Sequence, residues 1–460
     1  MPELSWEKLL SEVRRKDLYE VGGENTGTAG HRVEAERDYD RILFASPTRR
    51  LADKTQVFPL DSNDSVRTRL THSYEVSNLC RSIGITLAFN YPEKVFGENH
   101  EKLQVKRKVP AILAAIGLAH DLGNPPYGHQ GEEAVRNWFL SLSNSVGGGE
   151  QVPEDFQQFD GNPQTLRLLT RLQILNDDFG YNLTLGTLAA LIKYPCFCRS
   201  KSDHGYKKFG IFESEKTIAK EIWKETGLAE GVRHPLTYIM EACDDIAYLV
   251  LDAEDTVRKG LASFADLVDA LNSCEYRDDA IVKEVRDFSV EKNTTYKKEG
   301  LSSAELNEIS MQMFRVKAIH HMVNSVVNVY VNKIGNIMNG SLNPGFQLIK
   351  HSAAGPLCSI LKEFDVRYGY QNKQVLELEL KGKNTITETM DLLWSAITCR
   401  NTAFSKYAWV LLSENYRRAH GKSIESFMYK NCQLLADSIS GMTDTYVFNI
   451  NRKLRDLYRK

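Results

Sequence analysis

Apolar residues recur every three or four positions along most of the chain, a spacing that predicts α-helices. Leu70, Tyr74 and Ile83 fit one helical face. The run AILAAIGLAHDLG follows Pro110, and LTYIMEACDDIAYLVLDAEDTVRKG follows Pro235, so each proline is expected in the first turn of a helix. Further helices are expected from about Gly131 onward and over residues 165–176, 183–193, 303–335, 386–400, 403–419 and 423–439.

Strand signals are confined to one place. The segment VLELEL (375–380) alternates apolar and acidic residues before Gly382, and such alternation is typical of a half-buried strand. The VRYGY segment just before it is a candidate partner. The sequence shows no internal repeat and no clear linker. It therefore predicts one mainly α-helical body over residues 1–460, with a small β excursion near 365–382.

The composition changes this picture little. The chain has 460 residues, of which 42% are hydrophobic and 26% charged, and its formal net charge is -2, as in ordinary soluble globular proteins. A near-neutral chain has no global basic field that would attract nucleic acid or an anionic membrane. The cysteines form no CxxC pair, and no apolar run is long enough to span a bilayer. A cytoplasmic protein without a membrane partner is therefore expected.

One short stretch does not fit a purely structural helix. The apolar helix that contains AILAAIGLA is expected to end at His120 and Asp121, before the two prolines of DLGNPPYGHQGE. The helix dipole makes a C-terminus an unfavourable place for a carboxylate. A bound cation would reverse this penalty, so the pair is a candidate for metal binding.

Two other places offer further ligands. His72 lies on a predicted helix, where an ordinary core or surface histidine is the simpler interpretation. The segment MEACDDIAYLVLDAED places acidic residues inside an apolar helix, and buried carboxylates need a cation or hydrogen bonds. Either Asp244 or Asp245 could bind metal there. Asp244, Tyr248 and Asp252 are spaced four apart, so they share one helical face.

Two imidazoles and two carboxylates suit a hard or borderline divalent ion such as Mn²⁺, Mg²⁺, Fe²⁺ or Zn²⁺. Four protein ligands on an octahedral ion leave positions for water and for a phosphate oxygen. Such an open site is typical of metal-dependent hydrolases.

The order His…His-Asp…Asp resembles the HD-domain superfamily of metal-dependent phosphohydrolases. More specifically, the sequence resembles the bacterial dGTPase-like deoxynucleoside triphosphate triphosphohydrolases in RRLADKTQVFPLDSNDSVRTRLTHSYEVS (49–77), GLAHDLGNPPYGHQGEEA (117–134), MEACDDIAYLVLDAED (240–255) and SISGMTDTY (438–446). The likeness covers most of residues 36–260 and the last segment, whereas 265–435 match weakly. It implies an α-helical HD hydrolase with its motif region at about 65–260 and a C-terminal helical part at about 300–460.

The resemblance also implies which residues bind metal and act on substrate. It makes His72, His120, Asp121 and Asp244 the metal ligands, and it prefers Asp244 to Asp245 because Tyr248 and Asp252 then face the sugar. His129 would act near the scissile bond, oriented by Glu132. The other implied substrate contacts are Gln56 and Val57 along the deoxyribose or base, Arg69 at the α-phosphate, Asn124 along the phosphates, and Lys193 and Tyr194 at the triphosphate.

These implications agree with simple electrostatics. A near-neutral protein that binds a triphosphate must gather cations locally, and Arg69, Lys193 and a metal would supply them. His129 could donate a proton to a departing ribose oxygen. A tyrosine packed against the sugar would leave no space for a 2′-hydroxyl.

The sequence therefore predicts hydrolysis of deoxynucleoside triphosphates, with dGTP as the leading substrate and Mn²⁺ or Mg²⁺ as the expected cofactor, to deoxynucleoside and inorganic triphosphate. The family also leads us to expect a homo-oligomer, specifically a hexamer. Two alternatives stay open at this stage. One is an HD-type nucleotide phosphodiesterase or monophosphatase, which needs no triphosphate pocket, and the other is a module that senses dNTP or single-stranded DNA. Single-stranded DNA or a nucleotide effector is also a candidate partner of the enzyme.

Overall fold

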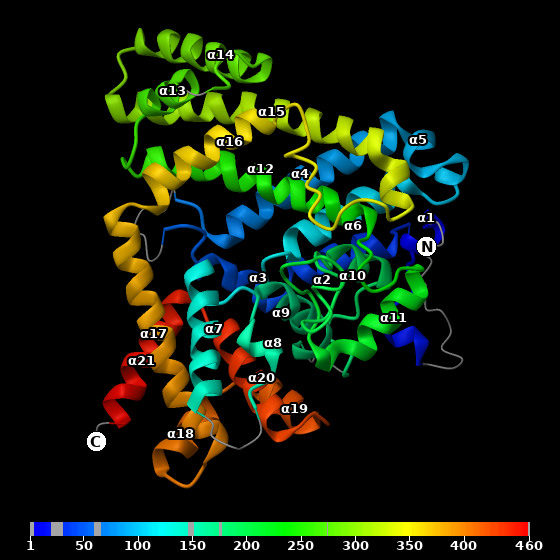
Figure 1. The fold of residues 1–460 in the computed structure, drawn as a ribbon, viewed down its shortest axis with the longest axis vertical. Helices are drawn as coiled ribbons and strands as arrows, with labels where there is room; N and C mark the ends of the chain where they lie inside the picture. Colours follow the sequence, from blue (N-terminus) through cyan, green and yellow to red (C-terminus); the bar gives the residue numbers. More distant parts are fainter. Residues whose placement is uncertain are drawn as a thin grey trace.

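The computed structural model describes residues 4–19, 31–58, 66–145, 151–173, 177–273 and 275–458. Within these ranges the chain is almost wholly helical (Figure 1), and extended pairing is limited to the isolated bridges Arg14–Thr184, Thr55–Thr68 and Phe197–Ile211. The predicted mainly α-helical fold class is therefore confirmed.

The helices follow one another along the whole described chain. They are α1 (Trp6–Leu9), α2 (Glu34–Leu43), α3 (Ser46–Arg50), α4 (Arg69–Asn90), α5 (Pro92–Phe96), α6 (Val105–Ala119), α7 (Gly128–Ser145), α8 (Glu154–Gln157), α9 (Gly161–Arg167), α10 (Leu185–Leu191), α11 (Lys216–Thr226), α12 (Pro235–Arg258), α13 (Phe264–Ser273), α14 (Ala280–Lys297), α15 (Ser303–Met338), α16 (Gly355–Phe364), α17 (Lys373–Thr398), α18 (Ala403–Leu411), α19 (Glu414–Lys422), α20 (Phe427–Ser440) and α21 (Asp444–Tyr458). Short 3₁₀ turns lie at Lys16–Leu18, Leu51–Asp53, Glu98–His100 and Glu213–Glu215, and π-helical turns at Leu168–Leu172 and Asp365–Tyr370.

The centre of the fold is the packing of α4 against α6, with α12 lying against both and α15 covering α12. Helices α4 and α6 approach each other closely at Gly117, where an added Cβ would lie 2.8 Å from the Cα of Ser77. The Ser77 hydroxyl donates to the Ala114 carbonyl across the same contact, at 2.8 Å. This close approach brings the C-terminus of α6 up to the side of α4.

A second group of helices forms around α17, which packs against α7, α20 and α21 (lower left in Figure 1). The helix α17 has no side chain at Gly382, where the Tyr127 ring lies against its backbone, and an added Cβ would meet the Tyr127 Cγ at 2.5 Å. Tyr127 belongs to the loop that joins α6 to α7, so α17 supports that loop from one side.

The two prolines expected at helix starts behave differently. Pro235 is the first residue of α12, and the N–H of Leu236, in the first turn, donates to the Nδ1 of the N-cap residue His234. Pro110 instead lies inside α6, which begins five residues earlier at Val105. The neighbouring α4 has Gly84 at this point, and the ideal Cβ position of Gly84 lies 3.0 Å from the Pro110 Cα, so the two helices pack closely here.

The β excursion expected near 365–382 is wrong. Residues 365–370 form a π-helical turn and residues 373–398 form α17. The buried positions of α17 include Val375, Gly382, Ile386 and Met390, which share a helical face. Leu, Glu and Lys are strong helix formers, and the alternation in VLELEL leaves Leu376 and Leu380 exposed rather than on one sheet face.

Among the described helices, none combines the length and the apolar character needed to cross a bilayer. The division into a motif region at about 65–260 and a C-terminal part at about 300–460 within one body stays a prediction.

We expect Gly382→Ala to lower the free energy of unfolding by about 1–3 kcal/mol, because overpacking a tight contact forces neighbours to shift. The new methyl group would clash with the Tyr127 ring. Urea unfolding followed by circular dichroism measures the change. Gly335→Ala on α15 is the matched control, since no atom lies within 4 Å of the added Cβ, and it should stabilise by about 0.5–1 kcal/mol. Equal effects of the two substitutions would contradict the tight contact.

Candidate active site

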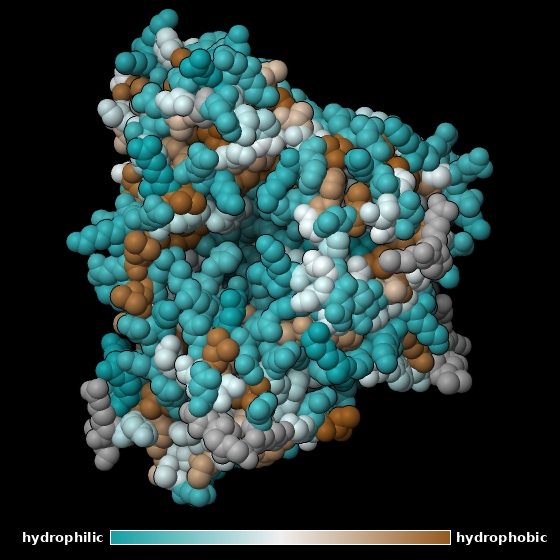
Figure 2. Space-filling view, in the orientation of Figure 1, coloured by the Kyte–Doolittle hydropathy of each residue, from teal (hydrophilic) through white to brown (hydrophobic). Residues whose placement is uncertain are grey.

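A cavity of about 390 Å³ lies where α4, α12 and the loop between α6 and α7 meet. The face drawn in Figure 2 is largely hydrophilic and is hollowed near its middle. Most of the residues predicted from the sequence line the cavity, namely Gln56, Arg69, His120, Asp121, Asn124, His129, Glu132, Lys193, Tyr194, Asp244 and Tyr248. His72, Val57 and Asp252 are not among its lining residues.

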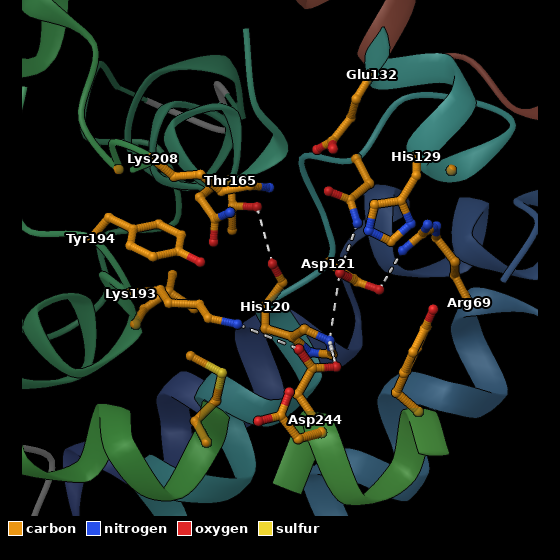
Figure 3. A pocket seen from close by; sticks show the side chains of 18 of the residues that line it. Arg69, His120, Asp121, His129, Glu132, Thr165, Lys193, Tyr194, Lys208 and Asp244 are labelled. Atoms are coloured by element: carbon orange, nitrogen blue, oxygen red, sulfur yellow. Dashed lines mark hydrogen bonds and ion pairs between the residues drawn. The ribbon is translucent and has the colours of Figure 1, made fainter. Parts of the chain in front are cut away.

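The predicted metal ligands come together from three helices. His72 lies on α4, His120 follows the last residue of α6, and Asp244 lies on α12; one ligand atom of each lies within 4.8 Å of the others. The Asp244 Oδ1 is 3.3 Å from the His72 Nε2 and 3.4 Å from the His120 Nε2. Asp121 joins them through its Oδ1, 3.5 Å from the His120 Nε2. Figure 3 shows His120, Asp121 and Asp244 pointing toward one another at the centre of the pocket.

The donor set fits a divalent ion. Ligand atoms about 2.1 Å from one ion lie about 3.0–3.4 Å apart, as in octahedral or tetrahedral coordination. The His120 Nδ1 lies 2.7 Å from the Gly117 carbonyl oxygen, so this nitrogen donates to the backbone and the Nε2 is the atom that faces the cluster, where an ion would replace its proton. The Nε2 is buried and has no hydrogen-bond partner among the described residues. A metal ion would satisfy it.

The charges around the cluster favour a cation. Burial alone would raise the pKa of Asp121, but His120 and Arg69 outweigh it and hold the pKa at about 2. Burial likewise opposes ionisation of Asp244, yet His120, His72 and Lys193 keep its pKa well below the usual range. Burial would lower the pKa of His120, whereas Asp121 and Asp244 raise it to about 9. Both carboxylates are therefore ionised, and the site attracts positive charge.

Cationic side chains, among them Arg69, Lys193, Lys208 and Lys362, line the same cavity. Arg69 is 3% exposed, and its Nη1 donates to the Asp121 Oδ2 at 2.5 Å. The Lys193 Nζ lies 3.7 Å from both the Asp244 Oδ2 and the Glu241 Oε1. Lys208, which sequence reasoning missed, also lines the cavity and pairs with Asp160 at 2.6 Å. Figure 3 places Arg69 on one side of the cluster, and Lys193 and Lys208 on the other. No local pattern marks Lys208 in the sequence, because a lysine in a loop has no periodicity to set it apart.

His129 and Glu132 stand near each other at the start of α7 (Figure 3). Burial, and then Arg69, lower the pKa of His129, which favours the neutral imidazole. Glu132 is buried, and its Oε1 accepts from the Gly161 N–H at 2.8 Å. Among the described residues no hydrogen bond joins it to His129. Its role in orienting His129 stays a prediction.

The other predicted contacts lie on the α12 side. Tyr248 and Asp252 follow Asp244 on one face of α12, and Asp252 is buried. The Tyr370 hydroxyl donates to the Asp252 Oδ2 at 2.6 Å, and the Tyr370 ring stacks with Tyr248 at 5.8 Å between centroids. The sequence prediction missed Tyr370 because it treated 365–382 as strand. Val57 lies in a separate small apolar cluster with Phe58, Val66 and Val375.

Comparison with known proteins agrees with this geometry. The HD-domain family pattern matches residues 69–168. Deoxyguanosinetriphosphate triphosphohydrolase-like proteins of Listeria monocytogenes and Pseudomonas aeruginosa are 34% and 30% identical to the chain, over 99% and 98% of its length and 100% and 98% of their own. The deoxyguanosinetriphosphate triphosphohydrolase of Yersinia pestis is 30% identical over 91% of the chain and 93% of its own length.

The helical fold and the His-His-Asp cluster define an HD-domain hydrolase. Within that class, the chain belongs to the family of deoxyguanosinetriphosphate triphosphohydrolase-like proteins.

We expect Asp244→Asn to abolish binding of Mn²⁺, because only this carboxylate of α12 lies beside both imidazoles. Asp245→Asn is the matched control on the next residue, and it should leave the affinity for Mn²⁺ within about threefold, a shift of less than 1 kcal/mol. Electron paramagnetic resonance titration of free Mn²⁺ measures both. If Asp245→Asn lost the ion and Asp244→Asn kept it, the choice between the two aspartates would be reversed.

Glu132 gives a pH-dependent prediction. Burial first, and Asp160 second, raise its pKa from 4.5 to about 7. Below pH 4.5 the carboxyl is protonated in both states, and above 7 the folded protein bears the full cost of the buried charge. Glu132→Gln should therefore gain stability relative to the unsubstituted protein as the pH rises from 5 to 8, in urea unfolding.

The neighbouring, partly exposed Glu133 supplies the control. A hydrogen bond from Lys383, at 3.0 Å, lowers the pKa of Glu133. Glu133→Gln should therefore be slightly less stable than the unsubstituted protein by a nearly constant amount from pH 5 to 8, because this carboxyl is ionised in both states there. Parallel pH curves for the two variants would refute the buried ionisation of Glu132.

Proposed function

We propose that the protein hydrolyses deoxynucleoside triphosphates in a metal-dependent reaction, with dGTP as the leading substrate, and releases deoxynucleoside and inorganic triphosphate. One observation carries this proposal. His120, Asp121 and Asp244 line one cavity together with the cations Arg69, Lys193 and Lys208, and His72 lies against Asp244 at 3.3 Å. The names of the relatives from Listeria, Pseudomonas and Yersinia support the same substrate class.

The cations suit a polyanion. The chain is near neutral overall, so a ligand with about four negative charges needs a local cluster of positive charge. The guanidinium of Arg69 can bind phosphate oxygens bidentately, and we assign it to the α-phosphate. We assign Lys193, Tyr194, Lys208 and Asn124 to the remaining phosphates.

His72, His120, Asp121 and Asp244 would hold one divalent ion, for which Mn²⁺ or Mg²⁺ is our first choice and Fe²⁺ or Zn²⁺ the alternatives. When bound, such an ion supplies activation of water and stabilises charge on phosphoryl oxygens. Oxygen-rich sites prefer Mn²⁺ and Mg²⁺, and imidazole suits Fe²⁺ and Zn²⁺.

His129 would act on the leaving group. A water oxygen bonds to the α-phosphorus as the bond from that phosphorus to the ribose O5′ breaks. The departing oxygen takes a proton from His129, and the attacking water releases a proton to solvent. The low pKa of the imidazole in the free protein follows from burial and from Arg69. A bound polyanion would favour the charged form of the ring. Glu132 would hold the ring and its surroundings in place.

Tyr248, Asp252 and Tyr370 form our proposed deoxyribose subsite, with Gln56 and Val57 along the sugar or base. The carboxyl of Asp252, already bonded by the Tyr370 hydroxyl, would meet the 3′-hydroxyl. The stacked rings of Tyr248 and Tyr370 would occupy the space that a 2′-hydroxyl requires.

The assembly and location of the protein also stay predictions. We expect a homo-oligomer, a hexamer by family expectation, in the cytoplasm. Single-stranded DNA or a nucleotide effector stays a candidate partner.

The decisive experiment incubates the protein with each of the four dNTPs and Mn²⁺ or Mg²⁺, and identifies the products by ion-exchange chromatography. We expect inorganic triphosphate and deoxynucleoside, with the highest kcat/KM for dGTP. His129→Ala should lower kcat by about 10²–10⁴-fold, the usual contribution of a general acid. Chelation with EDTA, or Asp121→Ala, should remove both metal binding and turnover.

Product identity separates this proposal from its alternatives. Release of phosphate or pyrophosphate, or activity on monophosphates and diesters, would support an HD phosphatase or phosphodiesterase. A sensing module would bind dNTP with no turnover, and its binding would not change in His129→Ala.

A further inference from the structure

Lys54 is a buried cation that does not line the catalytic cavity. It follows the 3₁₀ turn Leu51–Asp53 and is 3% exposed. Its Nζ donates to the carbonyl oxygen of Asn124 at 2.5 Å and to that of Ser440 at 2.6 Å. Its own carbonyl accepts from the Arg69 N–H at 3.0 Å. One residue thus joins the start of α4, the loop between α6 and α7, and the C-terminus of α20.

Burying this ammonium costs desolvation free energy, and the two hydrogen bonds it makes could be made without a charged group. Desolvation is the main reason that the pKa of Lys54 falls to about 7, and the nearby Arg69 adds to it. Two carbonyl groups could be bridged by a neutral donor or by water at a lower cost. Ser440 is the last residue of α20, and the negative end of the helix dipole offsets part of the penalty. We therefore look for a role of Lys54 in fixing the position of the Asn124 carbonyl and of the loop that carries it.

Asp444, the first residue of α21, adds a second link between the segment before α4 and the loop between α6 and α7. Its carboxylate accepts from the N–H of Thr55 at 3.0 Å, from the N–H of Tyr127 at 2.9 Å, and from the Thr55 hydroxyl. The Tyr127 hydroxyl donates to the Asp444 carbonyl at 3.2 Å. Tyr127 has φ +58°, a left-handed conformation that a non-glycine residue keeps only when its surroundings enforce it.

The loop held in this way carries groups of the proposed reaction. The Asn124 Nδ2 donates to the Asp121 Oδ1 at 2.7 Å, and α7 begins at Gly128, one residue before His129. A shift of the Asn124 carbonyl would therefore move Asn124 on one side and His129 on the other, while His72 and Asp244, on α4 and α12, would stay in place.

We propose that Lys54 is a positioning residue of the hydrolytic reaction: its ammonium, together with Asp444, fixes the loop Asp121–Gly128 between α4 and α20 and so sets where His129 meets the substrate. This inference rests on the proposed function. Lys54 touches neither substrate nor metal in this arrangement, so its removal should weaken turnover more than binding.

The test replaces Lys54 by Met, which keeps the length of the side chain and removes its donors. Lys54→Met should lower kcat about 10–100-fold, since a displacement of about 1 Å can cost about 10²-fold. The affinity for Mn²⁺ should stay within about twofold, because His72, His120 and Asp244 stay in place. KM should change less than kcat, because Asn124 is one of several residues assigned to the phosphates. The control is Lys108→Met on α6, which removes a lysine of 15% side-chain exposure paired with Glu12 at 2.7 Å and should leave kcat unchanged.

A double substitution distinguishes positioning from general destabilisation. If Lys54 acts through His129, Lys54→Met should change kcat less than about threefold in a His129→Ala background, because coupled residues are not additive. An equal fall in both backgrounds would overturn the proposal. Thr55→Val, which removes only the hydroxyl bond to Asp444, should show a smaller fall of the same kind and replaces Lys54→Met if that variant does not fold.

A readout without substrate keeps the inference separate from the proposed function. In hydrogen–deuterium exchange, Lys54→Met should speed exchange in peptides covering 121–131 and leave those of α15 unchanged. Faster loop exchange in a protein that hydrolyses no dNTP would support the clamp and refute the function. Active enzyme with unchanged loop exchange and unchanged kcat in Lys54→Met would refute the clamp and leave the function standing.

Discussion

Two ionised carboxylates, Asp121 and Asp244, lie at the junction of α4, α6 and α12. Much of the surrounding structure offsets the repulsion between them and the cost of their desolvation. Buried carboxylates that face each other are unfavourable unless cations or hydrogen-bond donors lie between them. Here His72 and His120 approach Asp244 at 3.3 and 3.4 Å, and Arg69 reaches Asp121 at 2.5 Å. The close approach of α4 and α6 at Gly117 allows this convergence. The core packing and the chemistry of the site therefore depend on the same helix contact.

The acidic groups along α12 lie in opposite electrostatic surroundings. Near the cluster, His120 and the nearby cations hold the pKa values of Asp121 and Asp244 low. Two turns further along α12, beside Tyr370, burial raises the pKa of Asp252 well above its usual value. The helix therefore carries an ionised carboxylate beside the two imidazoles and a neutral carboxyl group beside Tyr370. This division follows from where Arg69, Lys193 and His120 lie, since Asp244 and Asp252 stand on the same helix two turns apart.

The fold class and the His120-Asp121 pair could be predicted from local signals in the sequence, whereas most of the other candidate site residues followed from the resemblance to the dGTPase-like family. Helical spacing is visible along the chain, and His120-Asp121 at a helix end is visible as a conflict with the dipole. The error at 365–382 has a physical cause: alternation in VLELEL has the same period as a strand, but the tertiary context buries Val375 and Ile386 on one helical face. The same error is the reason that Tyr370 was missed. Lys208 and Lys54 could not be found locally, because their partners, Asp160 and the carbonyls of Asn124 and Ser440, lie far away in the chain.

The loop after α6 shows why such distant partners are needed. Proline at 125 disfavours helical backbone at Asn124, and proline at 126 lacks an N–H, so the chain leaves the helix with backbone groups that no neighbour along the sequence can satisfy. Buried backbone groups must find partners elsewhere. The Gly123 N–H donates to Thr165, the Asn124 carbonyl accepts from Lys54, and the Tyr127 N–H donates to Asp444. Each of these partners comes from a different part of the chain. Because α6 ends at this point, the loop that carries His120 and Asp121 is hydrogen-bonded to α9, to the segment before α4 and to the start of α21.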